Sequence, residues 1–373
     1  MPEEPALPPR TANRNRIYRM IYQNRGISRP ELCHRLGLSM PTVMQNVRQL
    51  QAAGLIEEAG SLDSTGGRKA VALACVQKAR IAVGLDLTVH HVSGVAVDLE
   101  GNILVQLRER RVFTANGGYA AALGKMVEAL LEQSGFSSER VLGVGISMPG
   151  TFSEDGSLML DSRLLRMQNL RTIELSRAIP LPCQFCNDAN AAGFAEVWDV
   201  QSPPDALYLS LSNTVGGAIL LGGRLYMGEN QRGGEFGHIT VQRDGRQCYC
   251  GKRGCLDAYC SAEVLSRLAE GNLEGFFQKL KSGDAKAHAA WERYLDDLAA
   301  GVDILRMAFD CPIILGGYVG AYMEDYLEPL RIRLAALNRF DRDGSYVRVC
   351  RYRTEASAVG AALLYVQAFL QGV

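Results

Sequence analysis

The first 80 residues show a pattern of apolar and polar positions that is typical of three short amphipathic helices. Apolar side chains recur at i, i+3 and i+4 within 13–24, which predicts the first helix. A second helix is expected between a capping serine, Ser28, and a terminating glycine, Gly37; a third is expected between Ser39 and Gly54. Two helices joined by a short turn that contains glycine are typical of a helix-turn-helix.

Two short apolar runs, 55–57 and 70–73, flank a glycine-rich stretch after the third helix and predict a two-stranded wing. In a winged helix-turn-helix, the N-terminal part of the third helix reads the major groove, and basic residues of the wing contact phosphates or the minor groove. The polar and basic residues expected to contact DNA are Ser39, Thr42, Gln45, Asn46, Arg48, Arg68 and Lys69. The same pattern would also fit a three-helix protein-interaction module with a solvated basic face.

From residue 81 onward, short apolar runs alternate with helical patterns, which predicts an α/β fold. The expected strands lie at 81–88, 92–97, 103–109, 141–147, 184–185, 206–211, 216–221, 313–315 and 346–351. The expected helices lie at 118–133, 191–198, 322–337 and 356–370, with mostly helical structure over 262–308. Cys183 and Cys186 have redox-motif spacing but lie on a predicted strand, so we expect two ordinary thiols there.

Charge separates the N-terminal part from the rest of the chain. The 373 residues contain 40 basic and 40 acidic side chains, but residues 1–80 carry twelve basic and six acidic ones, so the remainder has a net charge of −6. A basic N-terminal part suggests an anionic partner for that part alone. No apolar signal segment or membrane span is recognisable, and the ten cysteines include a metal-binding pattern, so a reducing, cytoplasmic location is expected.

One histidine and three cysteines lie within a short stretch of the second half: His238, Cys248, Cys250 and Cys255, with gaps of nine, one and four residues. Nitrogen and thiolate ligands in a set of four suit tetrahedral Zn²⁺, and a complete protein ligand set indicates a structural site. The alternative is a group of scattered buried thiols with no metal.

This stretch also resembles the signature of a known family. Glu235-Phe-Gly-His238, followed by Cys248-x-Cys250-Gly-x-x-Gly-Cys255, is similar to the motif of the ROK family, which comprises repressors, open reading frames and sugar kinases. The resemblance implies a two-lobed actin-like (ribonuclease-H-like) sugar-kinase fold over 81–373, preceded in the repressor branch by a winged helix. The domains expected are a disordered tail over 1–12, a DNA-binding domain over 13–73, a linker over 74–80 and a ligand-binding domain over 81–373.

The resemblance also implies a sugar site in the cleft between the lobes. Its contacts would come from Pro149, Gly150, Asn187, Asp188, Glu235, His238 and Asp257. Asp188 would be the general base if the chain were an active kinase. Asp257 stands where the family usually has glutamate; because aspartate is one CH₂ shorter, a different sugar, a phosphorylated sugar or a bridging water would fit there.

The phosphate-binding loops depart most from the kinase pattern. The run 86–90, at the first loop, contains no glycine, and Asn213 and Val215 replace two glycines of the second loop. On the adenosine side, Tyr318 replaces the last glycine of a Gly-Gly-Gly motif. Side chains at such positions block the close approach of backbone N–H groups to phosphate, and phosphoryl transfer depends on that positioning. We therefore leave kinase activity uncertain and expect little of it.

These observations predict a sugar-responsive transcriptional repressor of carbohydrate metabolism genes. It would bind operator DNA through the winged helix, a sugar or sugar phosphate in the cleft, and structural Zn²⁺. Because operator half-sites mirror two-fold protein symmetry, a homodimer or higher homo-oligomer is expected. The alternatives are an ATP-dependent sugar kinase with an appended DNA-binding head, and a repressor that senses a partner protein.

Overall fold

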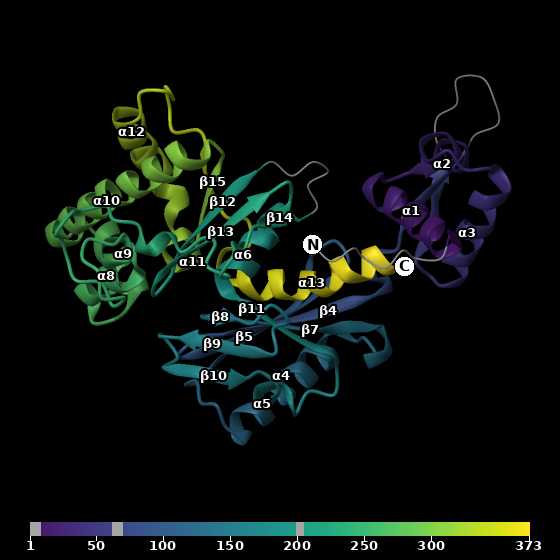
Figure 1. Ribbon diagram of the computed structural model, residues 1–373, viewed down its shortest axis with the longest axis horizontal. Coiled ribbons are helices and arrows are strands. Elements are labelled where there is room, and N and C mark those ends of the chain that lie inside the picture. The colour runs from purple at the N-terminus through teal and green to yellow at the C-terminus, as the bar shows by residue number, and fades with distance from the viewer. Residues whose placement is uncertain (1–8, 62–69, 199–204) are drawn as a thin grey trace.

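The N-terminal head consists of three helices packed on a small antiparallel sheet (Figure 1). The computed structural model describes residues 9–61, 70–198 and 205–373. The elements of the head are α1 (Pro9–Gln23), β1 (Ile27–Ser28), α2 (Arg29–Leu36), α3 (Met40–Ala52), β2 (Ile56–Ser61) and β3 (Val71–Cys75). The sheet has the order β1-β3-β2, so β1 is an additional strand that the sequence pattern did not predict.

Side-chain caps place the helix boundaries of the head where they were predicted. The Oγ of Ser28 accepts a hydrogen bond from the N–H of Glu31, and the Oγ of Ser39 accepts one from the N–H of Thr42. Gly37 ends α2 in the left-handed conformation. The first helix begins at Pro9, since proline suits the first helical turn, so 9–12 are helical and not part of the expected tail.

Lobe I is built on a five-stranded sheet with the order β11-β7-β4-β5-β6. Its strands are β4 (Ile81–Leu87), β5 (His91–Asp98), β6 (Ile103–Arg110), β7 (Val141–Met148) and β11 (Cys183–Asn187); its helices are α4 (Gly117–Ser134) and α5 (Ile173–Ser176). A second sheet, which the sequence analysis missed, comprises β8 (Thr151–Phe152), β9 (Leu158–Ser162) and β10 (Met167–Arg171). Its strands are too short to give a periodic signal.

Lobe II is built on a sheet with the order β14-β13-β12-β15-β16. Its strands are β12 (Ala206–Leu211), β13 (Val215–Leu221), β14 (Arg224–Leu225), β15 (Ile313–Gly316) and β16 (Val347–Val349). Its helices are α6 (Asp188–Val197), α7 (Asp257–Cys260), α8 (Ala262–Ser266), α9 (Leu273–Lys281), α10 (Ala285–Phe309), α11 (Gly317–Gly320) and α12 (Leu327–Leu337). The predicted α/β fold class is confirmed.

The C-terminal helix, α13 (Ala356–Gly372), joins all three parts of the molecule (Figure 1). It packs on the sheet of lobe I and on α6, and it contacts α1 of the head. The packing against α6 and β4 is close because glycines replace side chains at the contacts: a Cβ on Gly360 would lie 1.7 Å from the carbonyl oxygen of Ala191, and one on Gly84 would lie 1.8 Å from that of Ala358. One hydrophobic core therefore extends from the head through α13 into both lobes.

Polar contacts also hold the head against lobe I and α13. The Nδ2 of Asn15 donates to the carbonyl oxygen of Leu370 at 2.8 Å, and the Tyr22 hydroxyl donates to the carbonyl oxygen of Leu99 at 2.7 Å. Arg25 forms an ion pair with Glu100 at 2.7 Å. The head is thus attached through specific contacts to the turn between β5 and β6 and to the end of α13.

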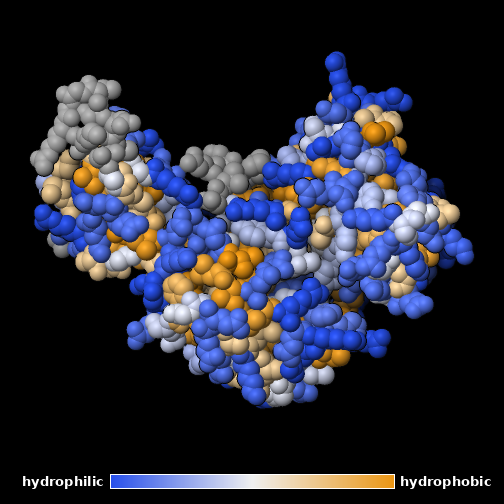
Figure 2. Space-filling view, turned by 180° about the vertical axis from the view of Figure 1, so that it is seen from behind, coloured by the Kyte–Doolittle hydropathy of each residue, from blue (hydrophilic) through white to orange (hydrophobic). Residues whose placement is uncertain are grey.

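Hydrophilic residues cover most of the molecular surface when it is viewed from behind (Figure 2). Among the helices of the described residues, none combines the length and the apolar character needed to cross a bilayer.

The Gly360–Ala191 contact makes a specific stability prediction. Gly360→Ala should lower the unfolding free energy by about 1–3 kcal/mol, because the added methyl group must push α13 away from α6. Gly372→Ala on the same helix is the matched control, since its Cβ would meet no atom within 4 Å. Thermal unfolding of both variants measures the effect. Equal melting temperatures for the two would contradict close packing of α13 on α6.

Candidate functional site

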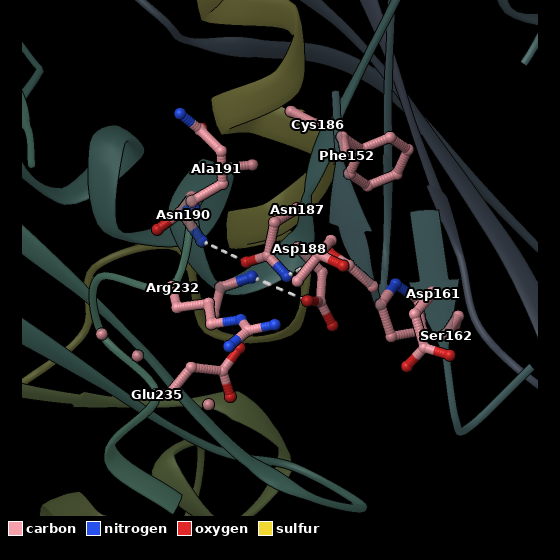
Figure 3. Close-up of a pocket in the computed structure, with 18 of the residues that line it drawn as sticks. Phe152, Asp161, Ser162, Cys186, Asn187, Asp188, Asn190, Ala191, Arg232 and Glu235 are labelled. Carbon is pink, nitrogen blue, oxygen red and sulfur yellow. Dashed lines mark hydrogen bonds between the residues drawn. The ribbon is translucent and has the colours of Figure 1, made fainter. Parts of the chain in front are cut away.

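A cavity of about 1090 Å³ lies where the two lobes face each other. Figure 3 shows Asn187 and Asp188 at the start of α6, Arg232 and Glu235 on a neighbouring loop, and Asp161 and Ser162 at the end of β9, all around this cavity. The predicted sugar-contact residues that line it are Pro149, Gly150, Asn187, Asp188, Glu235 and His238. The structure therefore brings together six of the seven residues that the resemblance implied.

The start of α6 fixes two of these residues. Asn187 is the N-cap: its Oδ1 accepts from the N–H of Asn190 at 3.0 Å, and its Nδ2 donates to the carbonyl oxygen of Gly150 at 3.1 Å. Asp188 follows as the first helical residue, and its carboxylate accepts from the N–H of Ala189 at 2.9 Å. The chain thus changes from β11 to α6 in a way that holds both polar side chains at the cavity wall.

Two carboxyl groups in this region, the buried Asp86 and the partly exposed Asp188, have raised pKa values. Burial raises the pKa of Asp188 to about 6; its backbone hydrogen bonds oppose this shift and the nearby charge of Glu235 adds to it. Burial, together with the charge of Asp188, raises the pKa of Asp86 to about 7, although the Ser147 hydroxyl donates to its carboxylate at 2.9 Å. A group that titrates near neutral pH can exchange a proton or accept a hydrogen bond from a ligand hydroxyl.

Asp257 is the predicted sugar contact that the structure places elsewhere. It lies at the start of α7 with 6% of its surface exposed, and its Oδ2 accepts from the N–H of Val215 at 2.7 Å. It is not among the residues that line the cavity in the described parts of the chain. The aspartate carboxylate therefore ties α7 to β13, and its contact with a ligand is not visible in this arrangement.

The histidine and three cysteines of the sequence motif converge beside the cavity. One ligand atom from each of His238, Cys248, Cys250 and Cys255 lies within 4.8 Å of all the others. The Sγ atoms of Cys250 and Cys255 are 3.7 Å apart, and Cys248 Sγ is 3.7 Å from His238 Nδ1. Tetrahedral Zn²⁺ with Zn–S bonds of about 2.3 Å requires sulfur atoms roughly 3.7 Å apart. The donor set and its spacing therefore fit a metal ion.

Backbone hydrogen bonds close the loop that carries these ligands. The N–H of Cys248 donates to the carbonyl oxygen of Lys252 at 2.9 Å, and the N–H of Leu256 donates to that of Ile239 at 2.9 Å. Gly254 has φ of +80°, and a Cβ there would lie 1.7 Å from the carbonyl oxygen of Gln242. Only glycine fits this position, which explains the second glycine of the sequence motif.

Part of the altered phosphate loops lines a second, much smaller cavity of about 50 Å³. Side chains of both lobes line it, including those of Asp86, Thr88, Asn213, Thr214 and Tyr318. Its volume lies well below the roughly 300–1,000 Å³ of most small-molecule sites. Residues 214–217 of the second loop also line the large cavity.

Several cavity residues escaped the sequence analysis. They come from the small sheet and from loops around the cleft: Asp161, Ser162, Arg163, Gln168, Gln231, Arg232 and Tyr249. Asp161 and Gln168 form a hydrogen bond of 2.9 Å across β9 and β10. Only the position of Tyr249, between two predicted metal ligands, offered a sequence signal that could have identified it.

The predicted DNA-contact residues of the head fall into three groups. Ser39, Gln45 and Arg48 are exposed on α3, and Thr42 is partly exposed. Asn46 is only 7% exposed and its Nδ2 donates to the carbonyl oxygen of Thr42 at 2.8 Å, so its side chain does not lie on the exposed face of α3. Position 46 lies on the same helix face as the buried Val43 and Leu50. The predicted residues Arg68 and Lys69 lie outside the described residues.

Comparison with known proteins gives matches over both parts of the chain. Residues 82–368 match the ROK family, and residues 10–57 match a winged helix-turn-helix DNA-binding domain. The xylose repressor of Bacillus subtilis (strain 168) is 30% identical over 261 residues, which span 68% of this chain and 66% of that repressor. The aligned part therefore covers just under two thirds of that relative's length.

Two solved structures share the fold. A ROK family transcriptional regulator, a homologue of the E. coli MLC protein, superimposes with a TM-score of 0.74, 22% identity and coverage of 97% of both chains. A ROK hexokinase from Thermus thermophilus superimposes with a TM-score of 0.60, 28% identity and coverage of 78% of this chain and 99% of the hexokinase. The predicted winged helix-turn-helix followed by a two-lobed actin-like sugar-kinase fold is confirmed.

Asp86 should make the stability of the protein depend on pH. Its pKa is 3.8 in a model peptide and about 7 when buried here, so the folded state keeps a proton that the unfolded state loses. Stability should therefore fall as the pH rises from about 4 to about 7. Asp86→Asn removes this titration. As the pH rises over the same range, the unfolding free energy of the variant should therefore increase relative to that of the wild type, by up to about 4 kcal/mol.

Urea unfolding at pH 5 and pH 8 measures the stability difference between Asp86→Asn and the wild type. Asp244→Asn, at an exposed position, serves as the control. A difference between Asp86→Asn and wild type that stays the same at both pH values would show that Asp86 is not a buried, proton-holding group.

Proposed function

This chain belongs to the ROK family, and from that premise we propose that it is a sugar-responsive transcriptional repressor of carbohydrate metabolism genes. The winged helix would bind operator DNA, and the cleft would bind a sugar or a sugar phosphate. The observation that carries the proposal is the contrast between the two regions of the cleft. The region around Asp188 and Glu235 forms the large cavity with its polar lining, while Asn213 and Tyr318 of the altered phosphate loops line a cavity of only about 50 Å³.

The lining of the larger cavity supports a sugar as its ligand. Asn187, Asp188 and Glu235 offer amide and carboxylate groups that form hydrogen bonds with hydroxyl groups. Arg163 and Arg232 add cationic groups at the same cavity, which would suit a phosphorylated sugar. A site with several fixed polar groups discriminates strongly against ligands that leave those groups unpaired.

The attachment of the head supports communication with the cleft. In the β5–β6 turn, the carbonyl oxygen of Leu99 accepts a hydrogen bond from the Tyr22 hydroxyl of the head. The carbonyl oxygen of Gly101 in the same turn accepts one from the Tyr352 hydroxyl at 3.3 Å. A Cβ on Gly101 would also lie 3.2 Å from the ring of Trp198, directly after α6. Because α6 begins at Asp188 in the cavity, a shift of α6 on ligand binding would reach the turn that holds the head.

We propose that the protein acts as a homodimer or a higher homo-oligomer. Helix-turn-helix regulators bind half-sites that repeat at about one helical turn of DNA, so two heads must be held at a matching distance. A change in the position of the heads relative to the lobes would alter that distance, and this would weaken or strengthen operator binding.

We also propose that His238, Cys248, Cys250 and Cys255 hold structural Zn²⁺. Bound there, the ion would cross-link the loop and leave no open coordination position for catalysis. Its effect on the ligand would be indirect: it would fix the segment that carries Glu235 and His238 at the cavity wall.

One observation favours a second function, a sugar kinase with an appended head. Asp188 keeps the position of the family's general base, and its pKa of about 6 suits proton transfer near neutral pH. The small volume of the cavity at Asn213 and Tyr318 argues against this function, because phosphoryl transfer needs a bound and oriented nucleotide. A carboxylate can also bind a sugar hydroxyl without catalysis.

Thermal unfolding of the zinc-loaded protein with candidate ligands tests the proposal. The panel consists of D-xylose, D-glucose, N-acetyl-D-glucosamine, their phosphates and ATP–Mg²⁺. A ligand that binds only the folded state raises the melting temperature, by an amount equivalent to about 2.7 kcal/mol at a hundred times its Kd. We expect a shift with one sugar or sugar phosphate and none with ATP–Mg²⁺. A shift with ATP–Mg²⁺, followed by phosphorylation of a sugar that Asp188→Asn abolishes, would establish the kinase instead.

Removing one metal ligand should weaken both the fold and the ligand response. Cys250→Ser is expected to lose the bound zinc, since it leaves an incomplete ligand set, and to unfold several degrees below the wild type. Cys183→Ser, at a free cysteine outside the cluster, is the matched control. Metal analysis and thermal unfolding give the readouts. Retention of a full zinc equivalent by Cys250→Ser, with unchanged ligand binding, would contradict the metal proposal.

A further inference from the structure

Tyr249 occupies the single position between two of the cysteines in the metal-binding loop, Cys248 and Cys250. It lines the large cavity, and 49% of its surface is exposed. Its ring packs edge-on against the ring of His238, with centroids 5.2 Å apart. Its hydroxyl oxygen lies 3.3 Å from His238 Nε2. The tyrosine and the proposed metal-binding histidine therefore lie side by side at the cavity wall.

The two nitrogens of His238 have different surroundings. Nδ1 lies 3.7 Å from Cys248 Sγ, on the side of the three cysteines, while Nε2 faces Tyr249 and lies 4.0 Å from a carboxylate oxygen of Glu235. A neutral imidazole carries a proton on one nitrogen and a lone pair on the other. If Nδ1 gives its lone pair to a metal ion, the proton must be on Nε2, which then donates a hydrogen bond to the Tyr249 oxygen.

This arrangement leaves the O–H of Tyr249 available as a donor. With the proton on Nε2, the hydroxyl oxygen accepts from His238, and among the described residues it has no second hydrogen-bond partner. Nor does Tyr249 belong to a hydrophobic core cluster of the described residues, so core packing does not account for its position. A rigid aromatic side chain with a polar end at a cavity wall is well suited to contact a ligand at low entropic cost.

We propose that Tyr249 is a specificity-determining residue of the ligand site, which donates its hydroxyl hydrogen to an oxygen of the bound sugar. Its hydroxyl would contact the sugar beside His238, and the hydrogen bond between His238 and Tyr249 would hold the two side chains in place. The inference rests on the proposed function as a sugar sensor. Because Tyr249 lies between Cys248 and Cys250, its position depends directly on the conformation of the metal-binding loop.

Tyr249→Phe tests this role, since it keeps the ring and removes only the hydroxyl. Zinc content and the melting temperature of the ligand-free protein should remain those of the wild type. Calorimetric titration with D-xylose, D-glucose, N-acetyl-D-glucosamine and their phosphates should show about a tenfold or greater loss of affinity for whichever ligand the wild type binds. Tyr226→Phe is the matched control, because Tyr226 is similarly exposed, at 52%, but is not among the residues that line the cavity.

A second readout follows the histidine itself. In zinc-loaded protein with ¹⁵N-labelled histidine, the Nε2–H resonance of His238 should shift when the wild type binds its sugar, and should shift much less in Tyr249→Phe. Equal affinity of the wild type and Tyr249→Phe would overturn the proposed role of Tyr249 while leaving the sensor intact. If no compound of the panel bound the wild type, the sensor proposal itself would fail, and the role of Tyr249 with it.

Discussion

The close packing of α13 is the constraint on which the rest of the structure depends. The helix can lie against α6 and the sheet of lobe I only because glycines stand at the contacts, notably Gly84 and Gly360. Its last turns contact the head, where the Asn15 side chain bonds the carbonyl oxygen of Leu370. Because packed interiors shift as units and deform little, the two lobes and the head cannot change their relation without moving this helix or repacking it.

The cleft shows how one fold can serve two kinds of function. The hexokinase and the transcriptional regulator to which this chain is similar share the two lobes, so the fold alone does not decide between catalysis and sensing. The decision rests on particular side chains. Asp188 and Asn187 give the large cavity a polar wall at the start of α6, whereas Tyr318 and Asn213 stand where the kinase pattern has glycine and line the small cavity.

The sequence predicted those features that depend on local chemistry. Ser28 and Ser39 were recognised as helix caps from residue type and position alone, and the spacing of His238 with the three cysteines predicted their convergence. Features that depend on tertiary contacts were harder to predict. The strands β8–β10 are too short to show a period, and nothing in the sequence indicates that the Asp257 carboxylate bonds the N–H of Val215.

Asn46 is an instructive exception, because its burial could have been predicted. It lies three residues after Val43 and four before Leu50, which places it on the apolar face of α3. The expectation that it contacts DNA came from its polarity, although its amide is satisfied within the helix by the carbonyl oxygen of Thr42. Residue type alone is therefore a weaker guide to a DNA-binding surface than helical periodicity.

Measurement of linked binding equilibria tests whether the cleft and the head are coupled. An operator duplex obtained by selection from random DNA would be titrated with the zinc-loaded protein, with and without the sugar that binds the cleft. The sugar would then be titrated with and without the duplex. We expect each ligand to change the affinity for the other by the same factor, about 5- to 150-fold. A factor of one in both titrations would contradict the coupling, since sugar and DNA would then bind independently.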